Sequence, residues 1–112
     1  MQALRREIRD FVREREWEKY HSPKNLAMGL TVEAAELLQL FLWLSEEDSR
    51  GLSDAQLRLL RQEIGDVMIY LVNLADKFDL DPLDCAREKL ALNREKYPVD
   101  KVKGSARKYT EY

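Results

Sequence analysis

Residues 26–44 read LAMGLTVEAAELLQLFLWL, and residues 63–75 read EIGDVMIYLVNLA. Drawn as helices, both stretches are apolar nearly all round, and such helices are normally buried, often against several neighbours or another subunit. Their only charged residues are Glu33, Glu36, Glu63 and Asp66. A lone carboxylate in apolar surroundings must be paired, protonated or bound to a metal ion. The two stretches therefore predict buried helices and mark their four acids as a candidate site.

The spacing of these acids places each pair on one helix face, because residues three apart are neighbours on a helix surface. If the two helices are antiparallel neighbours, all four carboxylates converge. Neither stretch contains a lysine or arginine that would neutralise them. Magnesium suits such a site, since it binds a few carboxylates and completes its coordination shell with water and phosphate oxygens.

Two alternatives to a magnesium site remain. The same spacings also occur on solvated helix surfaces, where they bind nothing. A di-iron bundle would need a Glu-x-x-His motif on two helices, and the only histidine, His21, lies outside both pairs. Gly29 falls on the same arc as Glu33 and Glu36, where it either leaves room for a ligand or lets a neighbouring helix pack closely.

The positions of helix-capping residues and prolines along the chain predict an all-α fold, a bundle of four main helices. Ser22-Pro23 and Asp81-Pro82 each give a cap followed by a proline at the first helical position, and Ser53 with Gln56 has capping-box spacing. The expected helices span about residues 2–19, 23–44, 53–78 and 82–97. Residues 45–52 are expected to form a loop. Residues 1–98 are expected to form one domain, followed by a basic tail at 99–112.

Composition narrows the functional classes. The 112 residues include 19 Lys and Arg against 21 Asp and Glu, a net charge of −2, so an electrostatic grip on a nucleic-acid polymer is not expected. The single cysteine, Cys85, excludes a disulfide within the chain and fits a reducing compartment. No signal peptide is apparent, and strongly apolar runs fall short of the ~20 residues that span a membrane. We therefore expect a cytoplasmic protein without a membrane partner.

The order Glu33-x-x-Glu36 followed by Glu63-x-x-Asp66 resembles the signature of the all-α nucleotide pyrophosphohydrolases, the MazG-like superfamily. Flanking residues are similar to its dCTP pyrophosphatase branch, and the likeness covers almost the whole chain. The stretches that carry it are Glu16 to His21 with Pro23 and Asn25-Leu26, then Trp43, Asp66 to Leu71, Lys89 to Asn93, Tyr97-Pro98, and Arg107 to Glu111.

This resemblance implies magnesium, cleavage between the α and β phosphates of a nucleoside triphosphate, and helices assembled across the subunits of a homo-oligomer, a tetramer first and a dimer second. The chain departs from the branch in its first helix. Members often carry a histidine there that helps to hold the base, and here Ile8 lies near that position. The preference for cytosine is therefore less firmly implied than the chemistry.

The acids receive specific roles in this hypothesis. Glu36, Glu63 and Asp66 would hold one magnesium ion at the α-phosphate, and Glu33 with Glu36 would help to hold another and orient the attacking water. Glu33 is the favoured catalytic base, and Glu36 is the alternative.

Candidate substrate-binding residues are less specific, because each has an ordinary structural explanation. Trp17 and Trp43 can stack on a base or be core tryptophans, and Tyr70 can reach a phosphate or sugar or be a core tyrosine. The other candidates are Asn25 and Asn73 on the arcs of the acids, and His21, which is either a pocket residue or a structural residue near a helix start. Lys89, Asn93 and Lys96 lie on one face of the fourth helix, with Arg94, Arg107 and Lys108 as further cations. Only the resemblance raises the residues of the fourth helix above solvated surface groups.

The sequence thus predicts a magnesium-dependent pyrophosphohydrolase that converts a dNTP, dCTP or a modified dCTP first, to the monophosphate and pyrophosphate in nucleotide-pool sanitation. The alternatives are a sibling activity on dUTP, phosphoribosyl-ATP or a broad range of triphosphates, and a non-catalytic helical interaction module in which the acids are structural.

Overall fold

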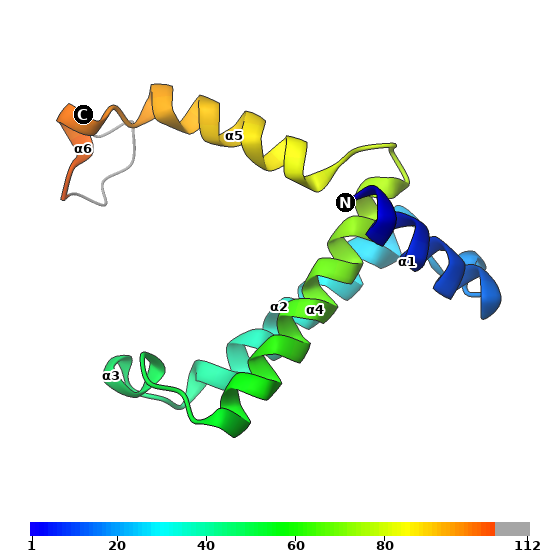
Figure 1. Cartoon of the computed structure of the whole chain (residues 1–112), viewed down its shortest axis with the longest axis horizontal. Helices are drawn as coiled ribbons and strands as arrows, with labels where there is room; N and C mark the ends of the chain where they lie inside the picture. Colours follow the sequence, from blue (N-terminus) through cyan, green and yellow to red (C-terminus); the bar gives the residue numbers. More distant parts are fainter. Residues whose placement is uncertain (105–112) are drawn as a thin grey trace.

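The computed structural model describes residues 1–104 and consists of helices joined by short turns, with no strand in that range (Figure 1). The elements are α1 (Gln2–Glu14), the 3-10 helix η1 (Glu18–Tyr20), α2 (Pro23–Leu42), α3 (Glu46–Ser49), α4 (Asp54–Asp76), α5 (Pro82–Lys96) and α6 (Val99–Val102). The all-α class is confirmed, and α1, α2, α4 and α5 correspond to the four predicted helices.

Three helices begin where their capping residues predict. Ser22 and Asp81 each accept a hydrogen bond from a backbone N–H in the first turn of α2 and α5, and a proline follows each cap. At the start of α4 the Ser53 hydroxyl accepts from the backbone N–H of Gln56 at 3.2 Å, and the Gln56 amide oxygen accepts from the backbone N–H of Ser53 at 2.8 Å. This reciprocal pair satisfies two N–H groups that a helix end leaves open.

The first helix ends at Glu14 rather than near Lys19, which corrects the predicted boundary. Glu16 adopts a positive φ of 53°, a left-handed conformation that few residues other than glycine adopt. The backbone N–H of Trp17 then donates to the carbonyl of Val12 at 3.1 Å. The chain therefore turns back, and the Trp17 ring comes to lie beside α1 instead of continuing along its axis.

Two further segments are more regular than the sequence predicted. The expected loop at 45–52 contains the single turn α3, whose cap is the Ser45 hydroxyl accepting from the backbone N–H of Asp48 at 3.0 Å. The tail after Pro98 begins with the short helix α6. Arg107, Lys108 and the rest of the tail sequence that carries the resemblance lie outside the described residues.

The centre of the fold is an antiparallel pair formed by α2 and α4, with α1 packed near the end where α2 begins (Figure 1). The small core lies at this end and consists of Ile8 and Val12 from α1, Leu26 from α2 and Val72 from α4. The face of α1 that carries Ile8 and Val12 therefore docks on α4.

Ion pairs fix α1 to the end of α4. Arg9 donates two hydrogen bonds to the carboxylate of Asp76, both at 2.6 Å. Arg5 is buried, donates to the carbonyl of Leu80 at 2.9 Å and places its Nε 3.5 Å from Asp76. The hydrogen bond from Arg9 holds the pKa of Asp76 below its ordinary value of 3.8, with the charges of both arginines acting in the same direction.

The last long helix, α5, leads away from the α2–α4 pair as a separate arm (Figure 1). None of its residues is buried, and Leu83, Leu90 and Leu92 are among its exposed apolar side chains. The radius of gyration is 17.7 Å, against the ~13 Å expected of a compact chain of this length. A single chain therefore leaves much of its apolar surface uncovered.

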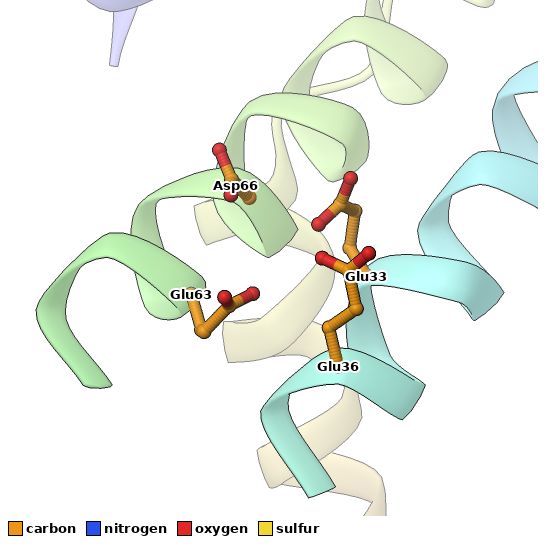
Figure 2. Close-up of side chains that lie close together, drawn as sticks. All are labelled: Glu33, Glu36, Glu63 and Asp66. Carbon is orange, nitrogen blue, oxygen red and sulfur yellow. The ribbon is translucent and has the colours of Figure 1, made fainter. Parts of the chain in front are cut away.

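The helix α2 is itself long and apolar enough, by length and composition alone, to cross a membrane. This corrects the expectation that the apolar runs of the chain fall well short of such a length. Glu33 and Glu36 divide the sequence into shorter uncharged runs, whereas α2 as a whole, with both acids included, has the length and the mean hydropathy of a membrane-spanning helix. Both acids face α4 (Figure 2), so the same helix also carries one side of a polar site.

Candidate functional site

Four acids converge between α2 and α4, as the antiparallel arrangement predicts (Figure 2). Glu33 and Glu36 project from successive turns of α2, and Glu63 and Asp66 project toward them from α4. One carboxylate oxygen from each residue lies within 4.8 Å of those from the other three. The sequence spacing and the helix pairing together therefore build one acidic cluster.

The acids have no cationic partner in the described chain. None of the ion pairs formed among residues 1–104 includes any of the four. Glu33 and Glu63 each bury one carboxylate oxygen, Oε2, that has no hydrogen-bond partner. A buried polar atom without a partner costs roughly 1–3 kcal/mol, and more when it carries charge. These two oxygens could therefore accept a proton or a positively charged ligand.

Burial and like charges both disfavour the ionised forms of these acids. Loss of hydration is the largest cause and raises the pKa of Glu33 to about 7, with the neighbouring Glu36 and then the charges of Asp66 and Glu63 adding to it. The pKa of Glu63 is also raised, first by loss of hydration and then by the charges of Glu36 and Asp66. The charge of a cation bound between the helices would offset both effects.

The donor set suits a hard divalent cation. Carboxylate oxygens are the ligands that magnesium and calcium prefer, and magnesium keeps some of its coordination sites for water or phosphate. The exposure of Glu36 and Asp66 leaves one side of the cluster open to solvent. Such a site can hold a metal ion and still present it to a second ligand.

Gly29 lies one turn before Glu33, and the structure chooses between its two interpretations. A Cβ at this position would lie 2.2 Å from Cε1 and 2.8 Å from Cζ of Tyr70, far inside van der Waals contact. The absence of a side chain is thus what lets the Tyr70 ring of α4 pack against α2. The space beside Gly29 is filled by this ring, so the close approach of a neighbouring helix is the correct interpretation.

A pocket of about 240 Å³ adjoins the acids. The residues that line it are Phe11, Val12, Trp17, His21, Asp66, Ile69, Tyr70 and Asn73. Phe11 and Trp17 meet edge to face, with ring centroids 5.7 Å apart. Asp66 belongs to both the acidic cluster and the pocket wall, so the two features form one continuous site.

The polar end of this pocket contains a hydrogen-bonded pair. The amide nitrogen of Asn73 lies 3.2 Å from Nδ1 of His21, and Asn73 is buried. Loss of hydration, with a smaller effect from the charge of Lys77, lowers the pKa of His21 below its ordinary value of 6.5. The lowered pKa favours the neutral form of His21 at pH 7, and His21 and Asn73 line the same pocket as Asp66.

The comparison with known proteins agrees with this arrangement. Residues 29–112 match the MazG-like family, and the matched segment includes all four acids. The chain belongs to the MazG-like family.

This MazG-like chain is similar in sequence to dCTP pyrophosphatases. It is 38% identical to human dCTP pyrophosphatase 1 and 37% identical to the bovine protein, in each case over 99% of the chain. It spans 66% of the length of the human protein and 67% of the bovine one. A pyrophosphatase from Archaeoglobus fulgidus has the same fold, with a TM-score of 0.82 and 37% identity over 88% of this chain and 92% of that one. The predicted resemblance to the dCTP pyrophosphatase branch is confirmed.

Some candidate residues of the MazG-like chain lie away from the site. Trp43 follows the last residue of α2 and is 89% exposed, and the side chain of Asn25 donates to the carbonyl of Tyr20 at 3.0 Å rather than facing the acids. Lys89, Asn93 and Lys96 lie on α5, the arm that leads away from the α2–α4 pair (Figure 1). A single chain does not bring these residues to the acidic cluster, and their predicted roles stay untested.

Other residues of the pocket were not foreseen. Phe11, Val12 and Ile69 line it, and none of the three was among the predicted site residues. The sequence did not indicate the turn at Glu16, which brings Trp17 beside Phe11 and so forms this side of the pocket. Ile8, in the place where relatives often carry a histidine, is buried in the core and does not line the pocket.

Proposed function

We propose that this chain is a magnesium-dependent nucleoside triphosphate pyrophosphohydrolase that converts dCTP, or a modified dCTP, to the monophosphate and pyrophosphate, and that it serves nucleotide-pool sanitation in the cytoplasm. The observation that carries the proposal is the shared position of Asp66, which belongs to both the acidic cluster and the apolar pocket. A base in the pocket would leave its phosphates on the side of the acids. The relatives named dCTP pyrophosphatase support the substrate.

The acids would bind the cation that the phosphates need. Glu36, Glu63 and Asp66 hold one magnesium ion in this proposal, and Glu33 with Glu36 helps to hold another. Magnesium supplies positive charge that stabilises the phosphate oxygens and lowers the pKa of bound water. The two buried oxygens without partners, on Glu33 and Glu63, are the atoms that gain most from such an ion.

Residues of the chain position the reactants. The carboxylate of Glu33 orients a water molecule and accepts its proton as the water attacks the α-phosphorus, and pyrophosphate leaves. A general base must lie within hydrogen-bond reach of the proton that it accepts, and Glu33 belongs to the acidic cluster that would hold the ion and its bound water. Trp17 and Tyr70 form aromatic walls against which a base stacks.

The active form in this proposal is a homo-oligomer, a tetramer first and a dimer second. The α5 arm and the outer faces of α2 and α4 expose apolar side chains on a scale that normally marks an interface. A second copy would cover them and can bring Trp43, Lys89, Asn93 and Lys96 to a site they do not reach within one chain. Light scattering at low micromolar concentration tests this, and a monomer would contradict it.

The test of the activity is a panel of deoxy- and ribonucleoside triphosphates incubated with magnesium, with all products identified. Hydrolysis in oxygen-18 water should label the monophosphate, because attack falls on the α-phosphorus. Label in free phosphate, without an added pyrophosphatase, would show attack at the γ position and refute the proposal. Equal turnover of dUTP or of many bases would favour the sibling activities. No turnover and no effect of magnesium on stability would favour the interaction module.

A further inference from the structure

The hydrogen bond between Asn73 and His21 fixes which polar atoms the pocket offers to a ligand. An amide nitrogen can only donate, so Nδ1 of His21 must accept in the contact at 3.2 Å. The proton of the neutral imidazole therefore lies on Nε2. The pair has two unused groups left over, the Oδ1 acceptor of Asn73 and the Nε2–H donor of His21, since neither atom bonds to another described residue.

These two groups belong to the same pocket as the aromatic walls. Asn73 and His21 both line it, together with Phe11, Trp17 and Tyr70. The remaining lining residues are aliphatic apart from Asp66, which also belongs to the acidic cluster. A planar ring held between the aromatic side chains would therefore meet its polar contacts at the Asn73–His21 pair.

We propose that Asn73 and His21 read the amino edge of the base and so discriminate cytosine or adenine from uracil, thymine or guanine. An acceptor beside a donor complements an exocyclic amine beside a ring nitrogen that carries no proton, which is the edge of cytosine. Uracil presents the reverse pattern, a carbonyl beside a ring N–H. A site built to hydrogen-bond one pattern rejects the other because its own polar groups, here the buried Asn73 amide and the half-buried His21 imidazole, are then left unpaired.

The discrimination depends on the pair as a unit. If the imidazole proton moved to Nδ1, the Asn73 amide would have to turn its oxygen toward His21. The pair would then present a donor and an acceptor in the order that suits uracil. In the structure the Asn73 amide nitrogen, not its oxygen, lies toward Nδ1 of His21, which corresponds to the first arrangement. This inference rests on the proposed function because that proposal supplies the substrate class, a nucleotide. Nucleotide binding can nevertheless be measured without any catalysis.

The test uses the full chain and two substitutions of similar size, Asn73→Leu and His21→Phe, which remove the polar atoms and keep the bulk. Gln62→Leu, on the exposed surface of the same helix α4, is the matched control. Two ratios are measured for each protein. The first is the affinity for dCMP over dUMP, by calorimetry without magnesium, and the second is kcat/KM for dCTP over dUTP with magnesium.

The unaltered chain and Gln62→Leu should prefer the cytosine nucleotide in both ratios. Both pocket variants should lose roughly tenfold or more of that preference, with values for the uracil nucleotide nearly unchanged. Equal losses for both nucleotides, or an unchanged ratio in variants that keep the native circular dichroism spectrum, would overturn the inference. If one variant does not fold, the other decides. If the chain binds dCMP selectively yet cleaves no triphosphate, the proposed function fails while the inference stands.

Discussion

The contact between Gly29 and Tyr70 permits a sharp test of how the site is assembled. In Gly29→Ala the new methyl group would lie 2.2 Å from Cε1 of the Tyr70 ring, so the ring or α2 must move. Overpacking of this kind costs roughly 1–3 kcal/mol, whereas alanine in place of glycine within a helix gains about 1 kcal/mol. The net change should therefore be a loss of about 0–2 kcal/mol in the free energy of unfolding.

Gly65 supplies the matched control, because a Cβ there would meet nothing within 4 Å in the described chain. Gly65→Ala should gain the full helix propensity, about 1 kcal/mol, so the two variants should differ by roughly 1–3 kcal/mol. Urea unfolding of the metal-free proteins at one fixed concentration measures this, with midpoints and slopes compared. Adding Tyr70→Leu to Gly29→Ala should recover part of the loss. If Gly29→Ala is as stable as Gly65→Ala, the packing argument is wrong.

Three further outcomes follow from the acids and from the ion pair that holds α1. Magnesium at about 100 times its dissociation constant should raise the free energy of unfolding by about 2.7 kcal/mol, and an unchanged melting curve would count against a metal site. Glu36→Gln, Glu63→Gln and Asp66→Asn should each reduce turnover to background yet stabilise the metal-free protein, because like charges disfavour one another; variants that lose stability but keep turnover would contradict this. The lowered pKa of Asp76 means that its pairing with Arg9 stabilises the fold above the unfolded pKa and that this contribution fades as the pH falls through about 4 toward the lowered value. Asp76→Asn should therefore cost about 1.5 kcal/mol at neutral pH and progressively less in acid, as urea unfolding across that range would show.

The acidic cluster was predictable because its signals are local. Glu33 with Glu36 and Glu63 with Asp66 share helix faces through their spacing, and a short connection makes antiparallel neighbours of the helices that carry them. The capping residues Ser22, Ser53 and Asp81 located the helix starts in the same way. The convergence of the four carboxylates is thus confirmed, while their roles as ligands and base stay predictions.

The pocket was not predictable, because its geometry depends on contacts between distant segments. The left-handed turn at Glu16 has no glycine to announce it, yet it decides that Trp17 faces Phe11. The contact of Tyr70 with Gly29 joins two residues that are far apart in the sequence. The direction of α5 has no local signal either, and none of its residues is buried within the chain.

Different segments of the chain supply the acidic cluster and the pocket. All four acids lie on α2 and α4, whereas Phe11, Val12, Trp17 and His21, half of the pocket wall, come from the segment that precedes α2. Substitutions in that short leading segment can reshape the pocket without touching the ligands of a metal ion. If the proposed function is correct, substitutions in the residues that precede α2 would change the nucleobase preference and leave the four acids in place, so a designer seeking altered selectivity would randomise that stretch first.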